Sequence, residues 1–226
     1  MEDKGIKHLG VILDGNRRFA TKKMKETWKG HESGAETLEN FFDWIKEFNI
    51  KETTFYAFST ENFNRSKIEK ENLFRLFKIK FQETINNPKI YENKVRINFC
   101  GRLEMFDKEL QSLMKELMEK TKKHNKFIVN FAMAYGGRQE IVDAVKKVVD
   151  SKEKINEENI TKNLFIKEEP ELIIRTGGSI RTSNFLPWQS VYSEWIFLDK
   201  LWPEFTRKDL VYCIDEFKKR KRNFGK

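Results

Sequence analysis

The amino-acid sequence predicts an α/β protein in which helices flank a mostly parallel sheet of about six strands. Short apolar runs of strand length alternate with longer segments whose apolar residues recur at helical spacing. Several of the apolar runs end directly in glycine or polar residues, which is where ligands bind in open α/β sheets. The 226 residues contain no internal repeat or flexible linker, so we expect a single domain over residues 1–226.

The elements of the first half are predicted from the spacing of their apolar residues. Residues 9–13 form a branched apolar run that is typical of a buried strand. A basic, irregular link over residues 21–30 leads to a helix over residues 31–48, whose leucine, isoleucine and phenylalanine side chains share one face. Residues 53–58 form the second strand, and a stripe of phenylalanines marks a helix over residues 69–85.

The second half continues the alternation. Asp107 can cap one helix, and Thr206 with Asp209 forms a capping box for the terminal helix. The helix after residue 138 is expected to bury a branched face made of Ile141, Val142, Val145 and Val149. The remaining predicted elements are strands over 95–100, 127–133, 172–174 and 194–198, and a short helix within 151–163.

The first predicted strand ends in a turn that suits phosphate and a cation. The Asp14 carboxylate can hold Mg²⁺, and Gly15 lets the backbone approach a phosphate. Arg17 and Arg18 can each donate two hydrogen bonds to phosphate oxygens. An ordinary surface turn is an alternative. So is a haloacid-dehalogenase-like phosphatase, although that class needs a second aspartate where Asn16 stands.

Composition narrows the class of partner without choosing one. The net charge of +9 and the pI near 9.3 fit polyphosphate substrates, nucleic acid or an anionic membrane. Twenty phenylalanines allow an aromatic interior or an apolar ligand cavity. Cys100 and Cys213 are isolated thiols, which argues against a disulfide framework or a zinc site. No signal-peptide pattern or span of about 20 apolar residues occurs, so we expect a cytoplasmic protein, at most peripheral to the inner face of the membrane.

Three predicted strand ends share one chemical character, because each is followed by arginine together with hydroxyl, amide or carboxylate groups. In a parallel sheet these ends lie at one edge. His31 is expected to join them, whereas His8 and His124 are expected at the surface. The arrangement predicts a site for two phosphate-bearing groups and Mg²⁺ that works by positioning and charge stabilisation. The residues concerned are Asp14, Asn16 and Arg18, then Ser59, Asn62 and Arg65, and finally Arg175, Arg181 and Ser183.

Five motifs match a known family in order, and together they cover nearly the whole chain, from His8 to Gly225. They read HLGVILDGNRRFA, GHESGA, FYAFSTENFNRS, NFAMAYGGRQEI and IIRTGGSIRTSNFLPWQSVYSE. With these motifs the chain resembles the cis-prenyltransferases. Its paired arginines after Asn16 are similar to those of archaeal and eukaryotic members, where many bacterial members have glycine before the arginine.

The resemblance implies both an activity and a set of partners. The family extends an allylic diphosphate, here farnesyl or geranylgeranyl diphosphate, with isopentenyl diphosphate units, forming cis double bonds. It implies Mg²⁺ as cofactor, a Rossmann-like sheet, a homodimer, and a long-chain polyprenyl product that serves as a glycosyl carrier lipid. It further implies a peripheral membrane contact for product release and no role for nucleic acid.

The resemblance also implies roles for individual residues. Asp14 and Asn62 are expected to be catalytic, and Asp14 and Glu194 to hold Mg²⁺. Ser59 and Asn62 match residues implicated in removing a proton from the isopentenyl unit. The substrate-binding set comprises Gly15, Asn16, Arg17, Arg18, Phe19, His31, Ser59, Thr60, Glu61, Phe63, Arg65, Arg175, Arg181, Thr182 and Ser183.

The growing chain requires an apolar tunnel. Ala57, Val129 and the phenylalanine stripe of residues 69–85 can line it, although any one of these side chains can equally be plain core. Phe127 matches a position near the floor of the family's tunnel, where a large side chain stops growth. We therefore expect a long product, undecaprenyl-like or slightly shorter.

Some positions depart from the family pattern, and two other functions stay open. Thr27 and Ile180 stand where an arginine and a metal-binding histidine are common, and residues 222–225 fit the family's C-terminal RxG motif only loosely. A non-catalytic partner subunit of a heteromeric complex is one alternative, and retention of Asp14 and Asn62 argues against it. A basic nucleic-acid-binding module is the other, and the chain lacks the basic stripe with stacking aromatics that such a module needs.

Overall fold

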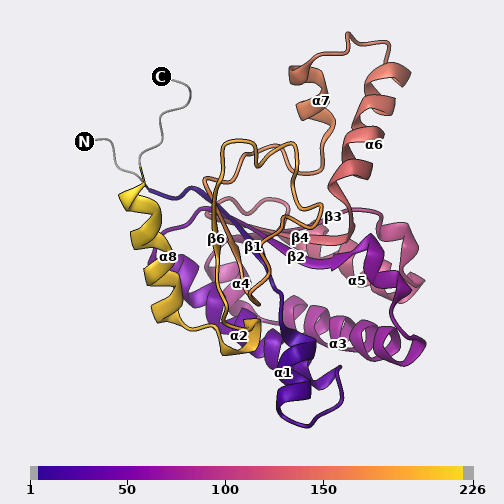
Figure 1. Ribbon diagram of the computed structural model, residues 1–226. Coiled ribbons are helices and arrows are strands. Elements are labelled where there is room, and N and C mark those ends of the chain that lie inside the picture. Colours follow the sequence, from indigo (N-terminus) through magenta and orange to yellow (C-terminus); the bar gives the residue numbers. More distant parts are fainter. Residues whose placement is uncertain (1–4, 221–226) are drawn as a thin grey trace.

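The computed structural model describes residues 5–220, which form one six-stranded sheet covered by helices (Figure 1). Every strand pair is parallel, and the order across the sheet is β3-β4-β2-β1-β5-β6. The predicted fold class is confirmed. The strands are β1 (His8–Ile12), β2 (Glu52–Ser59), β3 (Val95–Cys100), β4 (Phe127–Tyr135), β5 (Leu172–Arg175) and β6 (Glu194–Phe197).

The helices differ in length and follow most of the predicted segments. Asp107 and the Thr206–Asp209 capping box cap α5 and α8 as predicted. None of the helices described is long and apolar enough to cross a membrane. Their bounds are α1 (Asn16–Lys22), α2 (Lys29–Glu47), α3 (Lys67–Ile85), α4 (Pro88–Glu92), α5 (Lys108–Thr121), α6 (Gly137–Asp150), α7 (Glu157–Asn163) and α8 (Arg207–Lys219), with 3₁₀ turns η1 (Thr60–Asn64), η2 (Leu103–Met105) and η3 (Trp202–Glu204).

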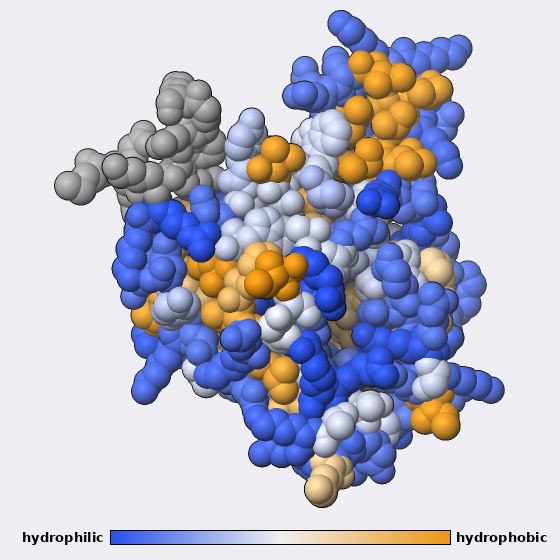
Figure 2. All heavy atoms as spheres, in the orientation of Figure 1, coloured by the Kyte–Doolittle hydropathy of each residue, from blue (hydrophilic) through white to orange (hydrophobic). Residues whose placement is uncertain are grey.

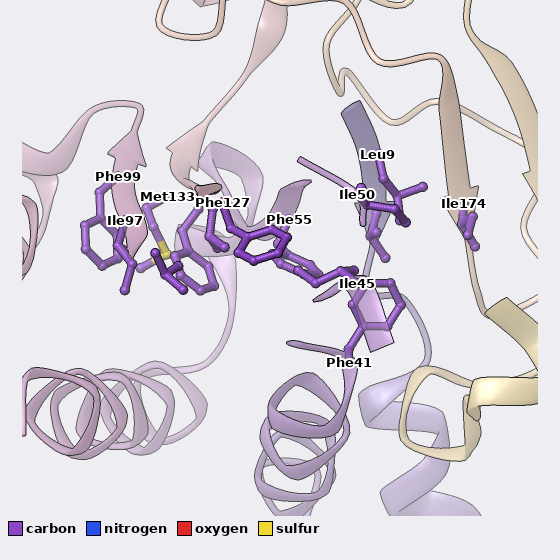
Figure 3. Close-up of a cluster of buried hydrophobic side chains, with 14 of the residues drawn as sticks. Leu9, Phe41, Ile45, Ile50, Phe55, Ile97, Phe99, Phe127, Met133 and Ile174 are labelled. Carbon is purple, nitrogen blue, oxygen red and sulfur yellow. The ribbon is translucent and has the colours of Figure 1, made fainter. Parts of the chain in front are cut away.

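The two faces of the sheet are covered differently. Apolar side chains of α2, α3, α5 and α8 pack on one face, where Phe41 and Phe55 meet edge to face with ring centroids 5.6 Å apart (Figure 3). The other face packs against Phe185 and Leu186 of a long loop. In Figure 1, α6 and α7 extend beyond the sheet. Figure 2 shows that their outer surface carries a cluster of apolar residues within a mostly hydrophilic surface.

Two helical details differ from the sequence expectation. Residues 16–22 form α1, where a loop and the start of an irregular link were expected, because Gly15 turns the chain at φ 113° and starts the helix immediately. Helix α6 buries Glu140, Ala144 and Val148, while Val142 and Val149 are about half exposed. The expected apolar face is therefore partly wrong, because α6 turns a hydrogen-bonded carboxylate inward.

Of the two histidines expected at the surface, His8 is buried and His124 is half-buried. His8 is 2% exposed, with Nε2 2.8 Å from Thr54 Oγ1 and Nδ1 3.1 Å from the carbonyl oxygen of Glu168. Burial lowers the pKa of His8 to about 4, so its ring is neutral at pH 7. His124 is half-buried, with Nδ1 against the carbonyl oxygen of Val95. β1 is one of the two central strands, and the sequence offers no sign that the residues around Glu168 cover its first residue.

Candidate active site

The carboxyl ends of β2, β1 and β5 meet at one edge of the sheet, as predicted. Ile12 pairs with Tyr56 on one side and with Arg175 on the other. The segments that follow these strands therefore start side by side. Asp14 follows β1, the η1 turn follows β2, and Arg175 ends β5.

Asp14 lies at the centre of this edge and is already oriented by arginines. Its Oδ1 accepts a hydrogen bond from Arg18 Nη2 at 3.0 Å, and its Oδ2 accepts one from Arg175 Nη2 at 2.8 Å. Its carbonyl oxygen accepts hydrogen bonds from Thr176 Oγ1 and from the Trp202 backbone N–H. Side chain and backbone are thus both fixed, with the carboxylate partly exposed to the cavity described below.

The GHESGA motif acts by letting α2 approach the start of α1. A Cβ atom on Gly30 would lie 1.9 Å from the Asn16 carbonyl oxygen. A Cβ on Gly34 would lie 2.2 Å from Asn16 Oδ1, a buried oxygen that has no hydrogen-bond partner. The two glycines, one helical turn apart, therefore let α2 pack directly against Asn16. His31 lies between them and lines the cavity beside α1.

Arg175 organises the loop that follows β5. The residue is 3% exposed, and its Nη1 donates to the Arg181 carbonyl oxygen at 2.5 Å and to Ser183 Oγ at 2.6 Å. Ser183 and Asn184 adopt left-handed backbone angles, with φ of 52° and 62°. The loop is thus folded around the buried guanidinium, and Arg181 is left exposed at the cavity.

The η1 turn presents a hydroxyl and an amide. Ser59 and Asn62 form a capping box, in which Asn62 Oδ1 accepts a hydrogen bond from the Ser59 N–H at 3.1 Å. Both line the cavity, and so does the exposed Glu61. The turn fixes these side chains within the space that Asp14 faces.

One carboxylate near the site was missed by the sequence reasoning. Glu69, in the first turn of α3, is 5% exposed. Its Oε1 lies 3.5 Å from Arg17 Nε, 3.5 Å from Arg65 Nη1 and 3.7 Å from His31 Nε2. Contact with His31 and the charges of the two arginines hold the pKa of Glu69 below its ordinary value, whereas burial lowers the pKa of His31. Its position, four residues after Arg65, was the available signal.

A cavity of about 1440 Å³ runs from this polar edge into the interior. Asp14, Arg175 and the η1 residues line one end. Phe127 and Val95, at the amino ends of β4 and β3, line the other. The predicted apolar tunnel is therefore present. Its apolar wall comes from the sheet and from α2 and α3, and includes Leu38, Phe42, Ala57, Leu73, Leu76, Phe77, Phe81, Phe99, Val129 and Phe131.

Several predicted substrate-binding residues lie outside this cavity. Phe63 packs with Phe58 and Phe106 in an aromatic cluster behind η1. Thr60 faces α6, where its hydroxyl would touch a Cβ placed on Gly136. Phe19 and Thr182 likewise do not line the cavity. Alternation of side chains along a short turn decides which residues face the cavity, and the sequence does not fix that alternation.

Comparison with known proteins agrees with the geometry. The family model described as putative undecaprenyl diphosphate synthase matches residues 12–225. The chain belongs to the cis-prenyltransferase family. A tritrans,polycis-undecaprenyl-diphosphate synthase (geranylgeranyl-diphosphate specific) of Pyrococcus abyssi is 45% identical over 97% of this chain and 87% of its own. Its counterpart in Methanocaldococcus jannaschii is 43% identical over 100% of this chain and 84% of its own.

Two solved structures have the same fold as this chain. A probable undecaprenyl diphosphate synthase from Campylobacter jejuni superposes with a TM-score of 0.86 at 35% identity, covering both chains fully. Lavandulyl diphosphate synthase from Lavandula x intermedia, in complex with dimethylallyl diphosphate, gives a TM-score of 0.93 at 27% identity, covering 98% of this chain and 99% of its own.

One expected metal ligand, Glu194, lies at the opposite end of the sheet from Asp14. Glu194 begins β6 opposite Leu172, at the amino end of the sheet, whereas Asp14 lies past the carboxyl end. The Glu194 carboxylate accepts a hydrogen bond from Arg220 at 2.7 Å. The expectation that Asp14 and Glu194 share one ion is therefore wrong for a single chain, because the length of the strands separates them.

The residues at Asp14 nevertheless fit Mg²⁺. Among residues 5–220, no group of three or more His, Cys, Asp or Glu side chains is arranged to hold a metal ion. Mg²⁺ does not need one, because proteins usually hold it through one or two carboxylates together with substrate phosphates. Asp14 offers such a carboxylate among arginines that suit the phosphates.

Three departures from the family pattern have different outcomes. Thr27 lines the cavity. The neighbouring Lys29 forms an ion pair with Glu26 and does not line the cavity. Ile180 is 82% exposed on the loop after β5. The loosely matching residues 222–225 lie outside the described part of the chain.

Proposed function

We propose that this chain is a Mg²⁺-dependent prenyltransferase that extends geranylgeranyl diphosphate with isopentenyl diphosphate to undecaprenyl length. The observation that carries the proposal is one continuous cavity with an arginine-rich end and a long apolar end. A diphosphate suits the first and a polyprenyl chain the second. The names of the archaeal relatives support geranylgeranyl diphosphate as the starter.

We assign the two diphosphates to the two halves of the polar edge. The allylic diphosphate would lie at the start of α1, against backbone N–H groups near Gly15 and the side chains of Arg18, His31 and Arg65. The isopentenyl diphosphate would lie at the loop after β5, against Arg181 and Ser183. Arginine suits both places, because its guanidinium can donate two parallel hydrogen bonds to phosphate oxygens.

In this assignment the chain itself supplies position and charge. Asp14 would hold Mg²⁺, which when bound supplies positive charge to the departing diphosphate. Arg18 and Arg175 orient the Asp14 carboxylate and add charge near the same phosphates. Asn62 and Ser59, fixed in the η1 turn, would orient the isopentenyl unit by hydrogen bonds, and a diphosphate oxygen would accept the proton that this unit loses, because a neutral amide or hydroxyl is too weak a base to keep it. The apolar walls exclude water from the reacting carbons.

Incubation with labelled isopentenyl diphosphate and one allylic starter at a time tests the proposal. With Mg²⁺ and geranylgeranyl diphosphate, we expect reverse-phase chromatography to show a product of undecaprenyl length. With farnesyl diphosphate in its place, we expect a lower kcat/KM. Addition of EDTA is expected to stop synthesis. If no polyprenyl product forms from either starter with Mg²⁺, the proposal is wrong and the alternative of a non-catalytic partner subunit is favoured.

We also propose that the chain acts as a single catalytic domain in a homodimer, with peripheral membrane contact when product leaves. The family resemblance supports the dimer. The exposed apolar residues of α6 form a surface whose contact with water is unfavourable, which supports a contact with a partner or a membrane there. Light scattering coupled to gel filtration measures the mass directly. A mass equal to one 27.1 kDa chain at micromolar concentration would rule out a stable dimer.

A further inference from the structure

Glu140, in the motif NFAMAYGGRQEI, is a buried carboxylate that the proposed mechanism does not use. It is 2% exposed and lies in the first turn of α6, outside the cavity. Its Oε2 accepts hydrogen bonds from Tyr135 Oη at 2.5 Å and from Gln189 Nε2 at 3.2 Å. Its Oε1 accepts one from the Phe165 N–H at 2.8 Å. All these partners are donors, so the network is built to receive a carboxylate.

The partners of Glu140 connect α6 to the loop after β5. Gln189 lies on that loop, is 1% exposed, and donates from Nε2 to the Ile166 carbonyl oxygen at 2.8 Å as well as to Glu140. Six residues before Gln189 on the same loop stands Ser183, which belongs to the proposed isopentenyl diphosphate site. Glu140 therefore binds a residue of this loop that lies outside the cavity, whereas Ser183 on the same loop lines the cavity.

A second contact fixes the same loop to the same helix end. The N–H groups of Gly137 and Arg138 donate to the carbonyl and side-chain oxygens of Asn184, both at 2.9 Å. A Cβ on Gly137 would lie 1.9 Å from Pro187 Cδ, so only glycine allows this approach. The loop is thus held on one side by the N-terminal turn of α6 and on the other by Arg175.

We propose that Glu140 and Gln189 are a positioning pair that holds the loop carrying Arg181 and Ser183 in its phosphate-binding conformation. The inference rests on the proposed function where it concerns isopentenyl diphosphate. Burial of a carboxylate is unfavourable unless hydrogen bonds replace its water. A neutral core could pack α6 equally well, whereas this carboxylate gathers donors from three segments, namely Tyr135 at the end of β4, Phe165 after α7 and Gln189 on the loop. The pair acts through the loop and touches no substrate.

Limited proteolysis tests the positioning of the loop without a measurement of prenyltransferase activity. Arg181 is exposed, so trypsin cleaves after it whenever the loop opens. We expect Gln189→Met and Glu140→Gln to speed the appearance of the fragment beginning at Thr182 by about fivefold or more, because each removes a buried hydrogen bond. Gln139→Met is the matched control, since Gln139 bonds Asp143 of α6 itself and makes no hydrogen bond to the loop. Equal rates in the wild type and in both variants would overturn the proposal.

Steady-state kinetics tests the consequence for the reaction. We expect the KM for isopentenyl diphosphate to rise about tenfold in Gln189→Met, while kcat and the KM for the allylic substrate change less than about threefold. The double variant with Glu140→Gln should be no worse than the worse single variant, because both remove one shared contact. An unchanged KM for isopentenyl diphosphate, or an equal loss for both substrates, overturns the positioning role. An inactive wild type contradicts the proposed function alone, and the proteolysis result then still decides the loop's anchoring.

Discussion

The Asp14 carboxylate receives a guanidinium group on each oxygen, and this arrangement makes its charge testable. In Asp14→Asn the amide nitrogen would face Arg18 or Arg175, donor against donor, and a Mg²⁺ ligand would be lost. We expect kcat to fall at least about 100-fold, with the fold intact by circular dichroism. Asp143→Asn serves as a control and should keep full activity, because Asp143 pairs with Arg102 and neither residue lines the cavity. A variant that retains more than about a tenth of the wild-type rate would contradict the role of Asp14.

His8 makes stability depend on pH in a defined window. Its pKa is about 4 in the folded chain and 6.5 when unperturbed, so between these values the unfolded chain binds the proton more strongly. The contribution of neutral His8 is fully present above pH 6.5 and is lost as pH falls toward 4, up to ~3 kcal/mol.

Thermal melts between pH 7.5 and pH 4.5 measure this effect. We expect the melting temperature of the wild type to fall more steeply with acid than that of His8→Gln, whose amide can still bond Thr54 without titrating. The difference between the two proteins isolates the effect of His8 from that of the half-buried Glu52 and the buried Glu140. Partial or full burial raises the pKa of these two carboxylates, so they act on stability in the opposite direction. Parallel slopes in the two proteins would show that His8 is not the cause.

For single residues, the sequence predicted the chemical character of the site better than it predicted which side chains are buried. Asp14, Arg175 and Ser183 were identified because polar residues directly after apolar runs mark strand ends. His8 and Glu69 were missed as buried groups, because no local pattern shows which polar side chain a distant segment will cover. The ring of Phe63, a predicted substrate-binding residue, packs with Phe74 and Phe106 of later segments, which no local pattern indicates.

The contact of α1 with α2 depends on the absence of one side chain. In Gly30→Ala the new Cβ would overlap the Asn16 carbonyl oxygen, which is backbone and cannot rotate away. The start of α1 must then move from α2. We expect a loss of about 1–3 kcal/mol in the free energy of unfolding and a raised KM for the allylic diphosphate.

Chemical denaturation and kinetics with each substrate varied in turn measure the two effects. Glu36→Ala, an exposed change on the same helix, is the control and should alter neither. If Gly30→Ala keeps wild-type stability and KM, the close approach is not needed for the site.

Most elements were predictable because their apolar spacing is regular and their caps are explicit, as with Asp107 and the Thr206–Asp209 box. α1 was not, since its seven residues carry little apolar signal and its start is a backbone turn at Gly15. The face of α6 was partly wrong because a buried network, and not apolar periodicity, orients it.

The cavity crosses the molecule from Asp14 to Phe127, so its far end sets how much chain it can hold. Phe127 is 5% exposed at the first residue of β4. In Phe127→Ala we expect the product distribution to shift upward by at least one isoprene unit. If Phe127 merely seals the core, the variant instead loses ~3–5 kcal/mol of stability and its products are unchanged.

Product chromatography at a temperature where the variant is folded separates these outcomes. Phe106→Ala is the matched control, because Phe106 is equally buried but lies outside the cavity wall. We expect it to lower stability without changing chain length. A folded Phe127→Ala protein with the wild-type distribution would exclude the role in length control.

The all-parallel sheet also governs how the chain reaches this structure. Strand β1, one of the two central strands, is the first to be synthesised, yet one of its two neighbours, β5, follows about 160 residues later. Ile12 and Thr176, which are hydrogen-bonded here, are 164 positions apart. Until β5 emerges, an apolar edge of β1 stays open, and such edges recruit other chains. Pairings this distant in sequence also slow folding. The same order that brings Asp14 and Arg175 together thus leaves the nascent protein exposed to aggregation until most of its length has been translated.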